Sequence, residues 1–296
     1  MSLVHKIEEV MMEYGSGSRH SIGAFILEQK SALANYTLQE VADATYTSKA
    51  AVVRFAKALG FSGWKAFLKA FWEEQSYQEQ HYTDIDANYP FTAQSSRQDI
   101  INQLCSLQIE SLLDTADLLD AAPLQECTEL LLHSKSIAMF GLNPNLTLAE
   151  LFKRKMLTIG RQVMLPSAGD TGLLAHSLTA EDCAIVISYS GNSIAHGPLN
   201  VLPVLKENGV PVIALTSVGD NLLRQYASYT LSISSYERLY SKISTFATEN
   251  SILYILNVLF ACCFAADYDA NMTRKIGTAR KLEVERHTNE QALREE

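Results

Sequence analysis

One segment of the chain brings together three serine hydroxyls, a glycine and an asparagine within six residues. Such a segment suits an anion, because backbone amides at a turn point outward, hydroxyls donate to oxygens, and glycine lets a ligand approach the backbone. A phosphate group matches this chemistry, although a serine-rich turn that caps a helix would explain four of the residues equally well. The candidate ligand-binding residues here are Ser188, Tyr189, Ser190, Gly191, Asn192 and Ser193.

A second candidate loop, Gly141-Leu-Asn-Pro-Asn145, follows an apolar run. The side-chain amides of Asn143 and Asn145 can donate hydrogen bonds to phosphate oxygens. Pro144 has no backbone N–H, so it removes one donor from the loop. Asn143 and Asn145 are therefore the ligand-binding candidates in this loop.

The third feature is a basic segment that contains no acidic residue. Between positions 44 and 72 there is no Asp or Glu, and five basic side chains give +5 over 29 residues, namely Lys49, Arg54, Lys57, Lys65 and Lys69. The whole chain carries −9 at pH 7, but an average over two domains can hide a local basic face. This segment predicts contact with DNA phosphates; a solvated helical face that lacks acids is the alternative.

Local signals around this segment predict two short helices. Thr37 and Glu40 have the spacing of a capping box, which predicts a helix to about Ala44. The next three residues turn the chain, and Thr47 as N-cap opens a second helix over 48–59, ended by Gly60. Two such helices form a helix-turn-helix, unless they belong to a plain bundle of three to five helices. The predicted DNA-binding residues are Thr47, Ser48, Lys49, Ala50, Arg54, Lys57 and Lys65, with Ser48, Lys49 and Ala50 at base edges.

Residues 137–233 alternate between short apolar runs and helical stretches. The predicted strands are 137–141, 162–165, 183–188, 210–216 and 229–233, and this order indicates a parallel sheet covered on both faces. An amphipathic helix over 100–119 precedes the sheet and could pack on its own domain or on a second subunit. Ligands of parallel sheets bind beyond the carboxyl ends of the strands, where both candidate loops lie.

Residues 52–68 resemble the end of the recognition helix and the following turn in the RpiR family of bacterial regulators, which reads much like "vvRFakkLGfsGfkelk". The positions that match are Arg54, Phe55, Leu59, Gly60, Phe61, Gly63, Lys65 and Leu68. A match of this length is specific. The resemblance implies an N-terminal DNA-binding domain and a C-terminal SIS domain, the sugar isomerase fold that binds phosphosugars.

The loop at 188–193 is similar to the "S-x-S-G-x-T" signature of SIS domains, with Ser193 in place of the threonine. The loop at 141–145 departs from the usual "G-x-G-x-S-x-x-x-A", since Asn143 and Asn145 replace the second glycine and the serine. Glu249 lies where SIS proteins often present an acid that contacts the sugar. A first-turn acid that stabilises a helix is an equal alternative for Glu249.

The composition of the chain argues against a disordered, membrane-spanning or secreted protein. A chain of 296 residues, 47% apolar and 19% charged, can form two folded domains and excludes disorder as the main state. The longest apolar run, 252–266, is 15 residues and falls short of a bilayer span. The acidic start argues against a signal peptide, and five cysteines without CxxC are typical of buried thiols in the cytoplasm.

No cofactor or metal is expected, because neither GxGxxG nor GxxxxGK[ST] occurs and His176, His196 and Cys183 lack metal-ligand spacing. The predicted fold class is α + α/β: an all-α helix-turn-helix domain over 1–75, a linker over 76–98, a parallel-sheet SIS domain over 99–270 and a charged tail over 271–296.

The resemblance implies a cytoplasmic transcription regulator of carbohydrate metabolism that binds double-stranded operator DNA and a phosphorylated sugar effector, with no membrane association. A two-fold symmetric operator requires two recognition helices, so a homodimer or a dimer of dimers is expected. Two alternatives stay open. One is a phosphosugar isomerase or lyase with Glu249 or His176 as the base; the other is a DNA-binding scaffold whose SIS domain only dimerises.

Overall fold

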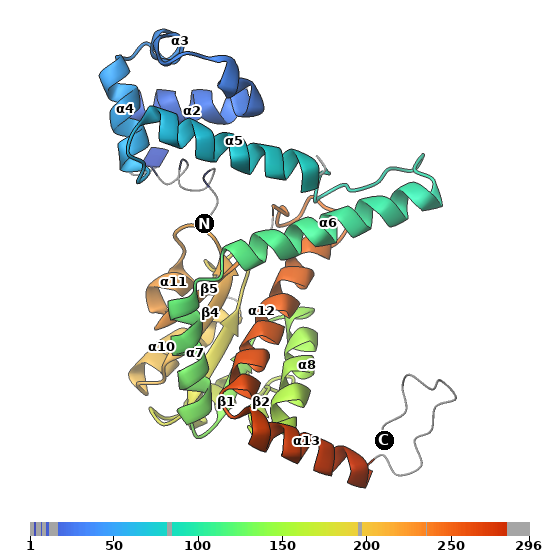
Figure 1. The fold of residues 1–296 in the computed structure, drawn as a ribbon. Coiled ribbons are helices and arrows are strands. Elements are labelled where there is room, and N and C mark those ends of the chain that lie inside the picture. The colour runs from blue at the N-terminus through green and yellow to red at the C-terminus, as the bar shows by residue number, and fades with distance from the viewer. Residues whose placement is uncertain are drawn as a thin grey trace. The chain divides into compact units, whose positions relative to one another are not determined.

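The computed structural model describes residues 3, 7, 10, 11, 17–81, 85–194, 197–234 and 236–282. Two compact units account for the chain (Figure 1). The first, which we call the helical unit, comprises residues 1–86 and 93–110; the second, the sheet unit, comprises residues 87–92 and 111–296. The chain therefore enters the sheet unit twice: for residues 87–92, and again from residue 111 onward.

The helical unit is built around one apolar core. Its elements are α2 (Ser18–Gln29), the 3-10 helix η1 (Lys30–Asn35), α3 (Leu38–Ala44), α4 (Lys49–Ala58) and α5 (Trp64–His81). Ile22, Val52, Phe55 and Phe67 are each fully buried in this core. The two helices predicted after Thr37 and over 48–59 correspond to α3 and α4.

The segment predicted as a linker, 76–98, is in part helical. Helix α5 runs on to His81, and α6 (Arg97–Asp117) begins before the predicted segment ends. Helix α6 also crosses from the helical unit into the sheet unit, since the boundary between the units lies at residues 110 and 111.

The sheet unit contains five parallel strands in the order β2-β1-β3-β4-β5. The strands are β1 (Ile137–Phe140), β2 (Val163–Met164), β3 (Cys183–Ile187), β4 (Val212–Ser217) and β5 (Tyr229–Ile233). All five lie within or next to the predicted ranges. The helices are α7 (Ala121–His133), α8 (Asn145–Thr158), α9 (Thr171–Ser177), α10 (Leu202–Glu207), α11 (Leu222–Tyr226), α12 (Phe246–Ala265) and α13 (Tyr268–Leu282), with the 3-10 helix η2 (Leu199–Val201).

Alternate residues of β1, β3 and β4 contribute to two cores, one on each face of the sheet. Ile137 and Met139 of β1 pack with α7, α8 and α12 on one face, and Ala138 and Phe140 pack with α9, α10 and α11 on the other. Strands β1 and β3 are buried on both sides, which explains why they appear in the sequence as continuous apolar runs. The predicted α + α/β architecture is confirmed.

The apolar run over 252–266, except its last residue, lies in helix α12, which is longer than the run and long enough to cross a bilayer. Within the described residues it is the one helix long and apolar enough to cross a bilayer, with 20 residues and a mean hydropathy of 1.4. Eight of its residues, including Ile252, Ile255 and Leu259, are nevertheless buried against the sheet and its neighbouring helices. In this fold α12 is a core helix.

The cysteines are all free, but they do not all lie in the core. Cys127, Cys183 and Cys263 are buried, whereas Cys105 is exposed on α6. Burial raises the pKa of the Cys127 and Cys263 thiols to about 12 and that of Cys183 to about 11. These three thiols stay protonated at neutral pH and are poor nucleophiles.

Candidate functional site

The helix-turn-helix begins with the capping box that the sequence predicts. Thr37 Oγ1 accepts a hydrogen bond from Glu40 N at 3.3 Å, and a Glu40 carboxylate oxygen accepts one from Thr37 N at 2.7 Å. Hydrogen bonding to Thr37 also lowers the pKa of Glu40. Helix α3 therefore starts at Leu38, as expected.

The cap of α4 is shifted by one residue from the prediction. Ser48, and not Thr47, is the N-cap: its Oγ accepts a hydrogen bond from Ala51 N at 3.2 Å. Thr47 Oγ1 instead contacts Thr45 Oγ1 at 2.9 Å inside the turn. The hydroxyl of Ser48 is thus partly committed to the helix, and Lys49 becomes the first residue of α4 to point outward.

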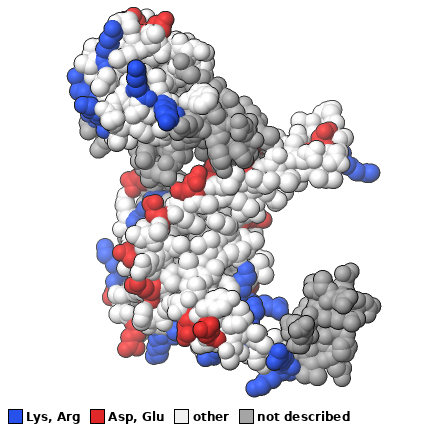
Figure 2. Space-filling model, viewed as in Figure 1, with Lys and Arg blue, Asp and Glu red and all other residues white. Residues whose placement is uncertain are grey.

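Helix α4 separates its buried and exposed faces cleanly. Ala51, Val52, Phe55 and Ala56 are buried. Lys49, Ala50, Arg54 and Lys57 are exposed and, at 3.6 residues per turn, fall within an arc of about 140°. Figure 2 shows the lysine and arginine side chains gathered over α4 and the start of α5, where Lys65 is also exposed. This is the arrangement a recognition helix requires: one face in the core and one basic face free for the groove.

In the sheet unit, both candidate loops lie at the carboxyl edge. The strand order reverses direction between β1 and β3: β1 leads to β2 on one side, and β3 leads to β4 on the other. A crevice forms at such a switch point, and ligands of open parallel sheets bind there. The loop at 141–145 follows β1 and the loop at 188–193 follows β3, so the topology brings these two loops together.

The loop at 188–193 is held by the turn after β4, which the sequence analysis missed. Gly191 has a φ of +63°, and a β-carbon there would lie 2.4 Å from Asn221 Oδ1 and 2.7 Å from Thr216 Oγ1. Asn221 is buried and donates to Thr216 Oγ1 at 3.1 Å, while Ser217 N donates to Tyr189 O at 3.1 Å. Thr216 and Asn221 thus pack against Gly191 and support this loop. Their signal in the sequence was weak, since a Thr at the end of a strand and an Asn in the turn after it are both common.

The serine side chains of this loop differ in their surroundings. Ser188 Oγ accepts a hydrogen bond from Gly191 N at 3.3 Å, so its own proton remains available as a donor. No hydrogen bond to another described residue engages Ser190 Oγ, and Ser193 is exposed with Asn192. Among the described residues, the first helical segments after this loop are η2 and α10. The groups that this loop offers to a ligand are therefore its amides and hydroxyls.

The loop at 141–145 does lead directly into a helix. Asn145 is the first residue of α8, and Pro144 is its N-cap. The N-terminus of this 14-residue helix lies at the crevice and favours an anion. A β-carbon on Gly141 would lie 3.3 Å from Asn145 Cβ and 3.6 Å from Ile187 O, so a larger residue here would be in tight contact with Asn145. Asn143 is exposed in the same loop.

Glu249 lies in the first turn of α12, at the same edge of the sheet. Its carboxylate accepts a hydrogen bond from Thr245 Oγ1. Helices α8 and α12 run in the same direction, because each starts near the carboxyl end of a parallel strand and packs back along the same face of the sheet, where Lys155 of α8 donates to Asn257 of α12. Asn145 lies about 15 Å before Lys155 along its helix and Glu249 about 12 Å before Asn257, at 1.5 Å per residue. The N-termini of both helices are therefore level at the crevice edge.

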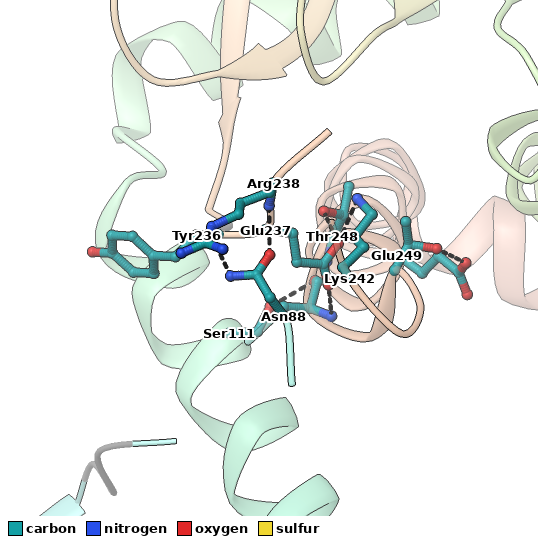
Figure 3. Close-up of polar contacts among 10 residues, drawn as sticks. Asn88, Ser111, Tyr236, Glu237, Arg238, Lys242, Thr248 and Glu249 are labelled. Carbon is teal, nitrogen blue, oxygen red and sulfur yellow. Dashed lines mark hydrogen bonds and ion pairs between the residues drawn. The ribbon is translucent and has the colours of Figure 1, made fainter. Parts of the chain in front are cut away.

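A buried carboxylate organises the chain between β5 and α12. The side chain of Glu237 is fully buried and accepts hydrogen bonds from Ala247 N at 2.6 Å, Thr248 N at 3.3 Å and Thr248 Oγ1 at 2.8 Å. Lys242 Nζ lies 3.4 Å from it (Figure 3). Glu237 thus caps α12 from a distant position in the loop.

The short segment 87–92 is fastened to this same loop. Asn88 is buried; its Oδ1 accepts from Arg238 N at 2.6 Å and its Nδ2 donates to Tyr236 O at 3.4 Å (Figure 3). Its backbone oxygen accepts from Ile243 N at 2.9 Å. Further along the chain, Ser111 of α6 donates to Ala247 O at 2.8 Å. The chain is therefore attached near the start of α12 at two places. Asn88 binds the loop before the helix, and Ser111 binds its first turn.

Among the described residues no group of three or more His, Cys, Asp or Glu side chains could hold a metal ion. His176 lies at the end of α9, and His196 falls outside the described residues. The candidate residues at the carboxyl edge of the sheet offer hydroxyls, amides and one carboxylate.

Comparison with known proteins agrees with this geometry. Residues 1–78 match the model of the rpiR-family helix-turn-helix domain, and residues 130–255 match the SIS domain. Uncharacterized HTH-type transcriptional regulators of Haemophilus influenzae and Bacillus subtilis (YbbH) are each 25% identical, over 85% of this chain and 86% and 87% of their own lengths. The Vibrio vulnificus NanR protein complexed with ManNAc-6P is structurally similar, with a TM-score of 0.58 at 19% identity over 97% of this chain and all of that one.

The fold and the comparisons together define a transcription regulator with a helix-turn-helix domain and a SIS domain. Its helix-turn-helix domain is of the rpiR family, and its SIS domain follows in the same chain.

Proposed function

We propose that this protein is a transcription regulator of carbohydrate-metabolism genes whose affinity for operator DNA is controlled by a phosphorylated sugar in the crevice between β1 and β3. One observation carries the proposal: the same chain holds a basic, acid-free recognition helix and a crevice lined by hydroxyls and amides. NanR, which shares the fold, is complexed with a sugar phosphate, and this supports the class of effector.

The sugar phosphate binds through three groups of residues. Its phosphate accepts hydrogen bonds from Ser188, Ser190 and Ser193, with Tyr189, Gly191 and Asn192 completing the loop. Asn143 and Asn145 donate from the other side of the crevice, where the dipole of α8 favours negative charge. Glu249 accepts hydrogen bonds from sugar hydroxyls.

On DNA, residues 47–50 enter the major groove while Arg54, Lys57 and Lys65 contact phosphates. One recognition helix contacts only a few base pairs, so the functional species is a homodimer or a dimer of dimers on a two-fold symmetric operator. It acts in the cytoplasm, where the bacterial DNA lies.

The first test is ligand binding, measured as the thermal shift of the full-length protein with a panel of hexose phosphates and the matching free sugars. We expect a shift with a phosphorylated sugar and none with its free form. Ser190→Ala should weaken binding about 10-fold or more through the loss of a hydrogen bond to a charged group. Ser177→Ala, at the far end of α9, is the matched control and should bind normally. Equal shifts with a sugar and its phosphate would overturn the proposed effector class.

A further inference from the structure

Tyr46, in the turn of the helix-turn-helix, has an unusual conformation and environment. Its side chain is 98% exposed, so almost the whole ring faces solvent. Its φ is +52°, and it is the one non-glycine residue with positive φ in the part of the chain that the structure describes. The left-handed region is disfavoured for a side chain that begins with a β-carbon. The turn thus keeps a strained residue whose ring contacts little of the protein.

Hydrogen bonds on both sides hold this conformation. Tyr46 N donates to Asp43 O at 3.2 Å, and Thr47 N donates to Ala42 O at 2.8 Å. The buried Thr45 hydroxyl donates to Val41 O at 2.7 Å. The backbone of Tyr46 is therefore ordered before any partner arrives, so that a contact by its side chain requires little further ordering. Strained residues held in this way cluster at functional sites.

The position of the turn indicates which part of the DNA it meets. In a helix-turn-helix the first helix crosses the phosphate backbone and the second enters the major groove, so the turn between them lies at the rim of the groove. Here those helices are α3 and α4, and Tyr46 precedes Lys49 by three residues. Tyrosine hydroxyls are among the groups that donate hydrogen bonds to DNA phosphates.

We propose that Tyr46 is a DNA-backbone contact, with its hydroxyl donating to a phosphate oxygen at the rim of the major groove. This inference rests on the proposed DNA-binding function. A phosphate contact carries no direct sequence information, so Tyr46 fixes the register of α4 on the duplex, and α4 provides the specificity.

The test uses Tyr46→Phe, which removes only the hydroxyl, and fluorescence anisotropy with two labelled duplexes: one selected from a random pool by the wild-type protein and one with that sequence scrambled. We expect affinity for both to fall by a similar factor of about 10. The log–log salt slope should not change, because a neutral hydroxyl releases no counterion. Tyr240→Phe, a tyrosine 93% exposed in the sheet unit, is the matched control and should bind both duplexes normally.

A second variant, Tyr46→Asn, separates folding from binding. Asparagine tolerates the left-handed region, so Tm should stay the same or rise while DNA affinity falls at least as far as in Tyr46→Phe. Wild-type affinity in Tyr46→Phe would overturn the hydroxyl contact, and so would a loss confined to the selected duplex, which would indicate a base contact. Failure of the wild-type protein to bind any duplex would instead count against the proposed function.

Discussion

At the start of α4, a single hydroxyl decides which residues can reach DNA. Ser48 and Thr47 are both good N-cap residues, and the sequence alone could not distinguish them. The structure assigns the cap to Ser48 because its Oγ, and not that of Thr47, accepts from the third amide of the helix, that of Ala51. Lys49 is therefore the first side chain of α4 that is free to contact a base.

We expect Lys49→Ala to weaken operator binding by about 1–3 kcal/mol and to relax the preference at one base pair. Lys65→Ala, if Lys65 contacts a phosphate, should weaken all duplexes alike and lower the log–log salt slope by about 0.9. Mobility-shift titrations at several salt concentrations measure both effects. Lys135→Ala in the sheet unit is the control. Operator affinity that is indifferent to both substitutions would contradict the assignment of α4 as the recognition helix.

The start of α12 depends on Glu237, a residue in the loop between β5 and α12 that is about ten positions earlier in the chain. Glu237 and Lys242 form an ion pair at 3.4 Å with both side chains largely buried, whereas Glu150 and Lys153 form a pair at the same distance on the exposed side of α8. Removing the partner of a buried charge lowers the free energy of unfolding far more than removing the partner of an exposed charge.

We therefore expect Glu237→Ala to lower the free energy of unfolding by about 3–5 kcal/mol, because Lys242 and the first amides of α12 lose their acceptor. Glu150→Ala, which breaks a pair of equal length, should lower it by less than about 1 kcal/mol. Chemical denaturation of both variants gives the comparison. Similar values for the two would show that Glu237 does not anchor α12.

Much at the element scale could be predicted from the sequence. The strands were predictable because β1 and β3 are buried on both faces and read as apolar runs, and the crevice loops were predictable because they follow those strands. The roles of Thr216, Asn221, Asn88 and Glu237 were not, since each acts through residues that only the fold brings close. Helix α5 also extends into a polar segment that gave no periodic signal.

At the scale of the whole molecule, a sugar can control DNA binding only if the two events share a conformational equilibrium. The chain between the two units offers a connection: Asn88 binds the loop that leads to α12, and Ser111 binds the first turn of α12, which carries Glu249. A change at the crevice edge can thus reach the segment that joins the helical unit.

We expect Asn88→Ala to reduce the effect of the sugar phosphate on operator affinity while leaving each separate affinity within about threefold. The reason is that coupling is a free energy distinct from either binding step, typically about 1–3 kcal/mol. Asn208→Ala, which removes an asparagine hydrogen bond to Leu178 O elsewhere in the sheet unit, should keep the full effect. Coupling of wild-type size in Asn88→Ala would rule out this connection.

The most direct test of the regulator is to titrate the sugar phosphate found by thermal shift into the protein–operator complex, follow operator anisotropy, and then recover the sugar by chromatography. We expect an altered operator affinity and an intact sugar. The linkage is reciprocal, so a sugar that weakens DNA binding about 100-fold, or about 2.7 kcal/mol, must bind about 100-fold less well to the DNA complex. Unchanged operator affinity with the crevice saturated, or steady conversion of the sugar that Glu249→Gln abolishes, would contradict the account.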